Sequence, residues 1–393
     1  MKIFKYLLSL SIVIIIASSC SDDITGSDGS GGTTDDGFNR KEMLTNWVNN
    51  IIIPSYEAFD LSLNKLKNDV EAFTSSPNTS SLNAVRLSWL DAYKAWQYVE
   101  MYNIGKAEEI YYSSYMNIYP LSLEKFKKDI NGNITNELIG GIIYNLQNGN
   151  YNLDSNNTKD EQGFPALDYM LYGIASDDVL ILEKYTTDPK ASNHKQYLND
   201  LINQMISKTD LIIADWNSNK DAVIAKDGNT KTSSTNKLTN DFVDYFEREF
   251  RANKIGIPAG IYSASTLPQD VEGYYGGVSR ELHLASYNAV YNFFNGIGFN
   301  SNTSGESFKT YLEYLGTKKK MTENLLTDVI NDQFAEINSG INSLLPNYAD
   351  QVNTDNNKMT STFQKIQLNV VNFKVEMMQA FKVSIDYTDS DGD

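Results

Sequence analysis

The chain has 393 residues, of which 41% are hydrophobic, which is enough for two domains with buried cores. Acidic residues outnumber basic ones by 50 to 33 and the formal net charge is -17, which argues against nucleic acid or an anionic membrane surface as a partner. One cysteine and two histidines are too few for a zinc site of the usual Cys/His type or for a Cys/His nucleophile pair.

The N-terminus has the pattern of a secretory signal peptide. Lys2 and Lys5 precede an apolar run that ends in small residues at positions 17–19. Cys20, the cysteine of the chain, follows directly, as in a bacterial lipobox. We therefore predict a lipoprotein signal peptide over residues 1–19 and lipidation of Cys20. The alternative is an ordinary signal peptide followed by an incidental cysteine.

Residues 20–39 consist mainly of Gly, Ser, Thr and Asp, with almost nothing to bury. This composition predicts a flexible acidic tether between the lipid and the first folded domain. Positions 21–23 resemble the acidic export signal of some Bacteroidetes surface lipoproteins. We therefore expect an outer membrane lipoprotein, either periplasmic or exposed on the cell surface, whose membrane partner is engaged through Cys20.

Helical periodicity begins after the tether. Apolar residues return every three or four positions from Leu44 to Phe73, which predicts a long helix with a kink at Pro54. A second helix is predicted over residues 82–101. One stripe of this helix carries Trp89, Tyr93, Trp96 and Glu100.

Glu100 places a carboxylate on that aromatic face. Because burial of a lone charge is costly, such a group normally has a partner, a raised pKa or a ligand. One interpretation puts Glu100 at the wet end of the face, paired with a lysine or arginine. The other makes Glu100, together with Trp96, part of a ligand site.

The rest of the chain is also predicted to be helical. Residues 111–120 and 131–160 are interpreted as short helices within long loops, and His194 as a solvated loop residue. Further amphipathic helices are predicted at residues 196–216, 237–252, 308–315 and 322–345, before a last helix with a regular apolar seam.

The polar segment 217–237 lacks strong periodicity and is interpreted as a domain boundary. No alternating strand pattern is long enough for a sheet, and no nucleotide-binding or hydrolase motif occurs, so we expect no nucleotide cofactor. We therefore predict an all-α protein with helical bundle domains at residues 40–222 and 223–393.

Residues 163–173, GFPALDYMLYG, form the most specific motif of the sequence. Pro165 suits the first turn of a helix, Asp168 lies one turn later on the same side, and Gly173 is a natural stop. Asp168 could simply interact with the helix dipole, or it could serve a site. The spacing predicts that Pro165 and Asp168 face the same way.

This motif resembles the signature of the imelysin family, in which a glycine, any residue, a histidine, two further residues and a glutamate enter an apolar helix that ends in glycine. Pro165 takes the position of the histidine, and Asp168 takes that of the glutamate. The chain therefore keeps only one shorter carboxylate in place of a potential pair of metal ligands or acid/base groups.

A second resemblance to imelysin-like proteins lies in residues 254–296. Ser279 is expected to cap the helix that it begins, and His283 is interpreted as a hydrogen-bonded core residue. The resemblance rests on Lys254, Glu272, Tyr274, Tyr275, Ser279, Phe294 and Gly296.

The resemblance implies two bundles of the four-helix type, which the recurring glycine-terminated helices suggest are related by internal duplication. It also implies a candidate site in the cleft between them and a role in bacterial iron uptake. Imelysin-like proteins were in addition classed as metallopeptidases. The ligand would be a small molecule or a metal, with iron or another divalent cation as the candidate cofactor and Asp168 as its candidate ligand.

Three functions remain open from the sequence. The first is a lipid-anchored, non-catalytic binding protein for iron or another nutrient. The second is a metallopeptidase, although such catalysis commonly needs three protein ligands that include histidine. The third is a structural or adhesion lipoprotein. The residues expected to line the cleft are Pro165, Asp168, Glu100, Trp96, Lys254, Glu272 and Ser279.

Overall fold

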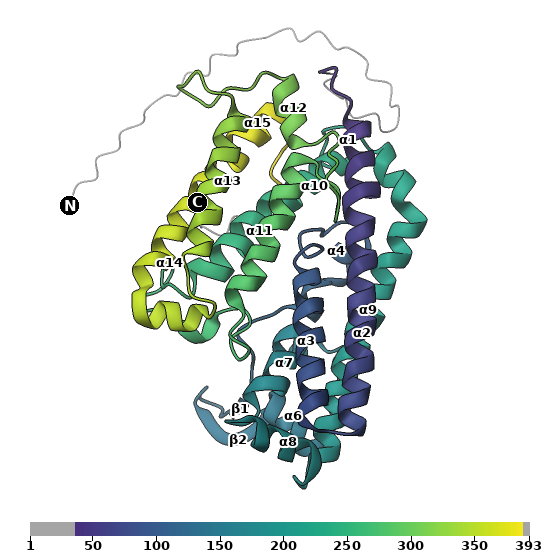
Figure 1. The fold of residues 1–393 in the computed structure, drawn as a ribbon, viewed down its shortest axis with the longest axis vertical. Coiled ribbons are helices and arrows are strands. Elements are labelled where there is room, and N and C mark those ends of the chain that lie inside the picture. The colour runs from purple at the N-terminus through teal and green to yellow at the C-terminus, as the bar shows by residue number, and fades with distance from the viewer. Residues whose placement is uncertain (1–35, 388–393) are drawn as a thin grey trace, which may run out of the picture. The chain divides into compact units, whose positions relative to one another are not determined.

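Helices account for almost all of the secondary structure, which confirms the predicted all-α class (Figure 1). The computed structural model describes residues 36–387, and all of them belong to one compact unit. The predicted signal peptide, Cys20 and most of the predicted tether lie outside the described residues. Within the described part, no helix combines the length and the apolarity that a bilayer crossing requires.

The first helices form one continuous rod (Figure 1). α1 (Arg40–Asn46) and α2 (Ile53–Ser75) are joined by a π-helical stretch, Trp47–Ile52. Pro54 is the second residue of α2 and has no N–H to donate. The wider π-helical turns lie directly before it, so the irregularity predicted at Pro54 takes this form within an unbroken helix.

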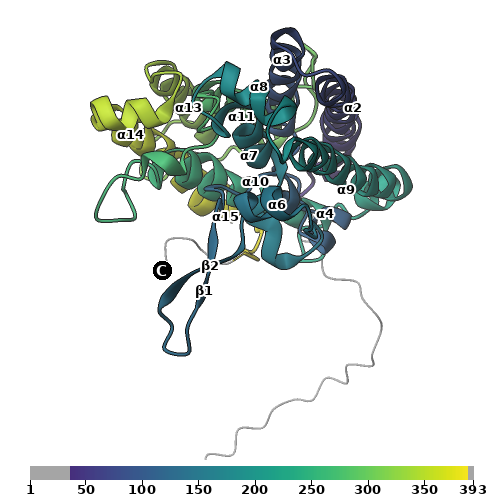
Figure 2. The same cartoon turned by 90° about the horizontal axis from the view of Figure 1, so that it is seen from below.

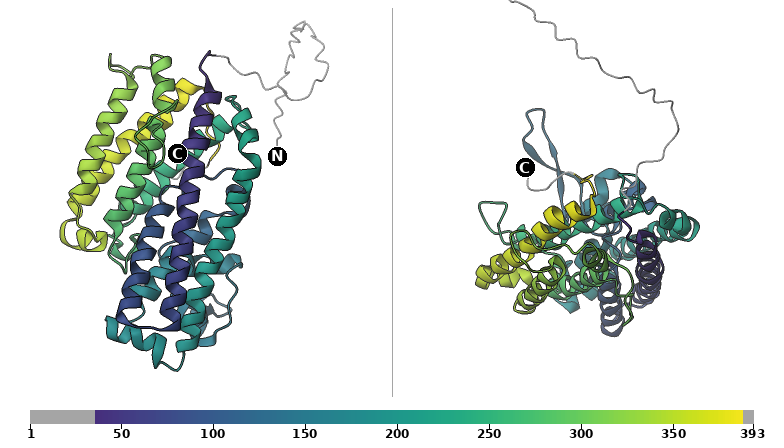
Figure 3. Two further views of the ribbon diagram at one scale, coloured as in Figure 1. Left: turned by 45° about the vertical axis from the view of Figure 1, so that its right-hand side comes forward. Right: turned by 90° about the horizontal axis from the view of Figure 1, so that it is seen from above.

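α2 packs side by side with α3 (Thr79–Trp96) and α9 (Ala191–Ala225) in the first group of helices (Figure 3). α3 ends at Trp96, so Glu100 lies in a turn after the helix. The sequence pattern had predicted that Glu100 lies within the helix, which is wrong. The turn keeps one helical hydrogen bond, from the Glu100 N–H to the Trp96 carbonyl at 3.0 Å.

α9 is longer than predicted at both ends and includes His194. The interpretation of His194 as a solvated loop residue is therefore wrong. Its side chain is buried, and its Nδ1 lies 2.7 Å from the carbonyl oxygen of Lys184. α9 continues to Ala225, past the predicted domain boundary between residues 222 and 223. The division into two domains stays a prediction, and so does the internal duplication.

A hairpin was missed by the sequence analysis. β1 (Lys125–Lys128) pairs antiparallel with β2 (Ile134–Gly140), and the hairpin projects away from the helices (Figure 2). Asn131 and Gly132 lie in its turn, and Gly132 has a φ of +84°. An Asn-Gly pair between short strands is the strongest local hairpin signal, but no residue of these strands is fully buried and their hydrophobic alternation is weak.

The second group of helices follows α9. Its α11 also contacts α3, which joins the two groups. Its main elements are α10 (Ser234–Tyr245), a π-helical stretch (Phe246–Gly256), α11 (Ser279–Asn295), α13 (Leu326–Asn342) and α14 (Tyr348–Val371).

Short elements connect the long ones. They are α4 (Lys106–Ile110), α5 (Ser113–Met116), α6 (Ile142–Asn148), a 3₁₀ turn (Asn156–Glu161), α7 (Gly163–Asp168), a π-helical stretch (Tyr169–Gly173), α8 (Asp178–Thr186), a 3₁₀ turn (Pro268–Asp270), α12 (Phe308–Tyr314), a π-helical stretch (Asn372–Met377) and α15 (Met378–Phe381).

One hydrophobic core runs through both groups of helices. Trp47, from the first rod, stacks on Phe293 of α11 with ring centroids 4.5 Å apart and meets Phe308 edge-on at 4.6 Å. Such aromatic contacts bury large apolar surfaces and favour defined geometries. The core therefore joins the two groups of helices directly.

Gly163 begins α7 in a conformation that glycine adopts far more readily than other residues. Its φ is +73°, and a Cβ added there would lie 2.1 Å from the carbonyl oxygen of Met116. Gly316 also has a positive φ, +60°, but a Cβ added to it would meet no atom within 4 Å. Gly163 is therefore required by both backbone conformation and space.

We expect Gly163→Ala to destabilise the protein more than Gly316→Ala. The control adds only left-handed backbone strain, about 1–2 kcal/mol, whereas Gly163→Ala also forces α7 away from the main chain of Met116. Urea unfolding of both variants measures the difference. Equal losses in the free energy of unfolding would contradict the close packing of α7 inferred here.

Candidate functional site

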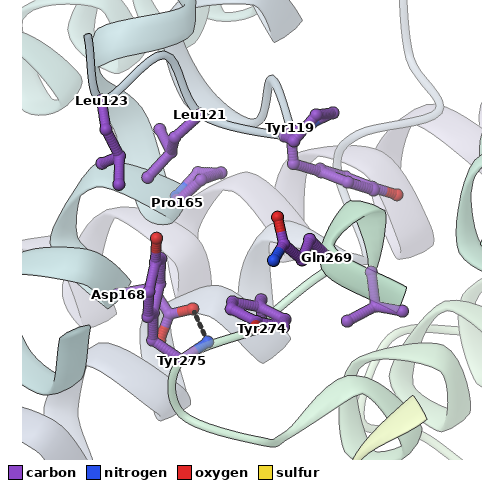
Figure 4. Close-up of a pocket in the computed structure, with 11 residues that line it drawn as sticks. Tyr119, Leu121, Leu123, Pro165, Asp168, Gln269, Tyr274 and Tyr275 are labelled. Atoms are coloured by element: carbon purple, nitrogen blue, oxygen red, sulfur yellow. Dashed lines mark hydrogen bonds between the residues drawn. The ribbon is translucent and has the colours of Figure 1, made fainter. Parts of the chain in front are cut away.

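α7 contributes to a pocket of about 300 Å³ (Figure 4). In Figure 4, Leu121 and Leu123 lie beside Pro165, and Gln269 and Tyr274 face them. The lining is mainly apolar and aromatic with a few polar groups, as in sites for small organic molecules. The lining residues are Tyr119, Pro120, Leu121, Leu123, Pro165, Asp168, Gln269, Val271, Gly273, Tyr274 and Tyr275.

Pro165 and Asp168 both line this pocket, so the structure confirms that they face the same way. The Asp168 carboxylate is 2% exposed and accepts the backbone N–H of Tyr275 at 2.9 Å and that of Gly276 at 2.8 Å. Burial raises the pKa of Asp168 to about 7, and the two N–H groups oppose this rise. Both carboxylate oxygens therefore already accept hydrogen bonds from the main chain.

Glycines allow the segment 273–277 to approach α7 and the helix after it. A Cβ on Gly173 would lie 2.2 Å from the ring of Tyr275. A Cβ on Gly276 would lie 3.0 Å from both the Asp168 Oδ1 and the ring of Trp89. The final glycine of the motif thus makes room for the same segment that Asp168 binds.

A buried ion pair fixes the start of that segment. Lys254 and Glu272 are each 2% exposed and form a salt bridge. The Lys254 ammonium also donates to Gln97 Oε1 at 2.7 Å, and Gln97 Nε2 donates to Glu272 Oε1 at 2.9 Å. These contacts link Gln97, which follows α3, to the second group of helices.

Asn117 extends the network to Glu100. Its Nδ2 donates to Glu272 Oε1 at 2.8 Å and to Glu100 Oε1 at 2.9 Å, and its Oδ1 accepts the Tyr93 hydroxyl at 2.5 Å. Three predicted site residues, Glu100, Lys254 and Glu272, are thus brought together. They form this buried network, however, and do not line the pocket at Asp168.

Ser279 does not cap its helix, in contrast to the prediction. It is the first residue of α11, and no side-chain hydrogen bond caps that helix. The Ser279 hydroxyl instead donates to the carbonyl oxygen of Glu272 at 2.7 Å. Ser279 therefore fixes the main chain of the residue whose side chain pairs with Lys254.

Trp96 and His283 belong to the core. Trp96 is fully buried and has aromatic neighbours that include Tyr112 and Phe164, away from the lining of the pocket. His283 is fully buried, and its Nδ1 lies 3.0 Å from the hydroxyl of Tyr348. The interpretation of His283 as a hydrogen-bonded core residue is confirmed.

Sequence reasoning missed several residues of this region. Gln97 lies four residues after Tyr93 and so belongs to the same helical stripe as Trp89, which was a usable signal. Tyr119 lies in a loop and Gln269 in a three-residue 3₁₀ turn, and neither segment carried such a signal. Their position in the pocket depends on tertiary packing alone.

The residues at the motif do not fit a metal centre. Asp168 is engaged by two N–H groups, and Pro165 has no donor atom in its side chain. Between residues 36 and 387, no group of three or more His, Cys, Asp or Glu residues could hold a metal ion. The described residues therefore offer no set of three such side chains that could bind a catalytic metal.

We expect Lys254→Met to lower the free energy of unfolding by about 3–5 kcal/mol, because it leaves the Glu272 carboxylate buried without its counter-charge. The double variant Lys254→Met/Glu272→Gln should lose less, because the remaining group is neutral. Lys127→Met is the control, since Lys127 forms an exposed pair with Glu137 and its change should stay within about 0.5 kcal/mol. Urea unfolding measures all three, and a double variant less stable than Lys254→Met would contradict this account.

Glu100 predicts a pH dependence of stability. Burial, which the neighbouring carboxylates reinforce and Lys254 opposes, raises its pKa from 4.5 to about 8. Between these pH values the folded state keeps a proton that the unfolded state releases, so this contribution is fully present below about pH 4.5 and is lost as the pH rises through about 8.

Glu100→Gln removes that titration, because the side-chain amide is neutral and its Oε1 can still accept from Asn117. We expect the free energy of unfolding of the variant to rise relative to that of the wild type, by up to a few kcal/mol, as the pH rises from about 5 to about 8. Urea unfolding across this range measures the gain. Glu57→Gln, at an exposed position on α2, is the control; a parallel pH profile for Glu100→Gln and the wild type would contradict the prediction.

Known proteins share the fold of this chain. The imelysin family model matches residues 52–371. An imelysin-like protein from Psychrobacter arcticum 273-4 is 17% identical, with a TM-score of 0.66 over 88% of this chain and 97% of that one. An iron-regulated protein A precursor from Parabacteroides distasonis ATCC 8503 is 18% identical, with a TM-score of 0.65 over 89% of this chain and 97% of that one.

At these identities the two structures establish a common fold. Among curated proteins, no match is found. The family model, however, extends over most of the chain and includes both the motif at residues 163–173 and the segment that packs against it. This chain therefore belongs to the imelysin family.

Proposed function

We propose that this chain is a lipid-anchored, non-catalytic binding protein that serves the uptake of iron or another nutrient at the cell envelope. Its ligand would occupy the pocket between Pro165 and Tyr274. The observation that carries the proposal is this pocket, of about 300 Å³, whose walls combine apolar and aromatic side chains with a few polar groups. Such a lining suits a small organic molecule or a chelated metal better than a bare ion.

The state of Asp168 favours binding over hydrolysis. A hydrolytic metal centre needs protein ligands and an open position for water. The carboxylate of Asp168 instead accepts hydrogen bonds from two main-chain N–H groups. Pro165 stands where the family signature has a histidine. The motif thus supports the wall of a pocket without supplying a hydrolytic centre.

The envelope location and the link to iron have separate support. Cys20 follows a secretory signal with the spacing of a lipobox, and an acidic tether follows it. The similar structure from Parabacteroides distasonis is described as an iron-regulated protein A precursor. Together these observations favour an anchored envelope protein whose ligand is an iron chelate or another nutrient.

A pocket-filling variant tests the proposal. Leu121 lines the pocket and is partly buried, so Leu121→Trp should occupy space that the ligand needs. We expect native mass spectrometry and elemental analysis of protein purified from iron-limited cells to show a bound species in the wild type and its loss in Leu121→Trp. Growth under iron limitation should be impaired in parallel.

Leu61→Trp is the matched control, because Leu61 is 71% exposed on α2. This control should retain both the bound species and normal growth. A Leu121→Trp protein that keeps the ligand and supports growth like the wild type would exclude this pocket as the binding site.

A further inference from the structure

A second pocket shares Tyr119 with the first. Its volume is about 200 Å³, and it is formed by residues after α3, around α5 and on the π-helical stretch after α10. Apart from Ile118, every residue that lines it carries a side-chain oxygen. Glu100 and Glu249 supply the carboxylates, and Asn253, Ser113 and Tyr119 are among the neutral groups.

Glu100 has one carboxylate oxygen to spare in this pocket. Its Oε1 accepts from Asn117, but its Oε2 has no hydrogen-bond partner within residues 36–387, although the side chain is only 9% exposed. The hydroxyl of Tyr119 is likewise buried, and no residue of the described chain bonds to it. Because an unsatisfied buried polar atom is costly, these two oxygens point to an additional group in the pocket.

Acidic side chains outnumber basic ones around the pocket. Three carboxylates, those of Glu100, Glu249 and Glu272, surround one ammonium group, that of Lys254. This ammonium is already bonded to Gln97 and Glu272.

Glu249 has further charged neighbours. Asp244 opposes its ionisation, whereas Arg248 favours it but is itself paired with Asp244 at 2.9 Å. Asn253, whose Nδ2 donates to Glu249 Oε2 at 2.7 Å, is neutral and adds no positive charge. A bound cation would supply the missing positive charge.

We propose that this pocket binds a hard divalent cation through the carboxylates of Glu100 and Glu249, with neutral oxygens and water completing the coordination. Oxygen donors without thiol or imidazole select ions of the magnesium, calcium and manganese class. Such ions are often held by one or two carboxylates and keep several waters, for which the pocket has room. Apart from Tyr119, this site uses other side chains than the ligand pocket at Asp168.

Isothermal titration of the folded, chelator-treated protein with MgCl₂, CaCl₂ and MnCl₂ tests the site. We expect one ion of at least one of these metals to bind per chain. Glu100→Gln and Glu249→Gln should each weaken binding by at least about 10-fold, because each removes one of the two charged ligands. Glu57→Gln, which neutralises an exposed carboxylate elsewhere, should bind as the wild type does.

The variants also separate the site from misfolding and from the first pocket. Glu100→Gln is expected to be at least as stable as the wild type near pH 7, so weaker binding by this variant cannot be attributed to unfolding. Leu121→Trp should leave cation binding unchanged, since Leu121 lines only the first pocket. A failure to bind cations would therefore leave the proposed ligand pocket untouched. Loss of the proposed ligand pocket would likewise leave the cation site untouched.

Three results would overturn the inference. The first is no binding of any of the three metals by the wild type at about 1 mM, the weak end of extracellular calcium sites. The second is equal affinity of the wild type, Glu100→Gln and Glu249→Gln. The third is binding of methylammonium but of none of the metals, which would assign the pocket to an organic cation.

Discussion

One buried carboxylate joins the two groups of helices at the candidate site. Asp168, at the end of α7, accepts the main-chain N–H groups of Tyr275 and Gly276, which lie in the segment leading to α11. Charge-assisted bonds from two adjacent N–H groups fix the direction of a loop as well as its distance. The wall of the pocket that carries Tyr274 depends on this contact, because the segment has no regular secondary structure there.

A second clamp acts on the same segment a few residues earlier. Glu272 is held by Lys254, Gln97 and Asn117, and nearly all of this network is buried. A buried ion pair adds little net stability, because desolvation offsets most of its attraction. Its geometric effect is larger. Together with Asp168, it fixes the loop that lines the first pocket at two points, and through Asn117 it reaches the second pocket.

The motif at residues 163–173 is therefore explained by packing more fully than by catalysis. Gly163 lets α7 begin against the carbonyl of Met116, and Gly173 leaves space for the ring of Tyr275. Asp168 binds the main chain between these contacts. A family signature can thus describe how a binding surface is assembled, even where the residue that could have bound a metal is replaced by proline.

The sequence by itself determined the helical class, the shared orientation of Pro165 and Asp168, and the burial of His283, because a 3.6-residue period and local spacing encode which side of a helix is buried. Only the tertiary structure decided that Asp168 would bind main chain and that Glu272 would meet Gln97. Their partners lie more than 100 residues away in the chain. Such pairings depend on how whole helices pack, and no local pattern records them.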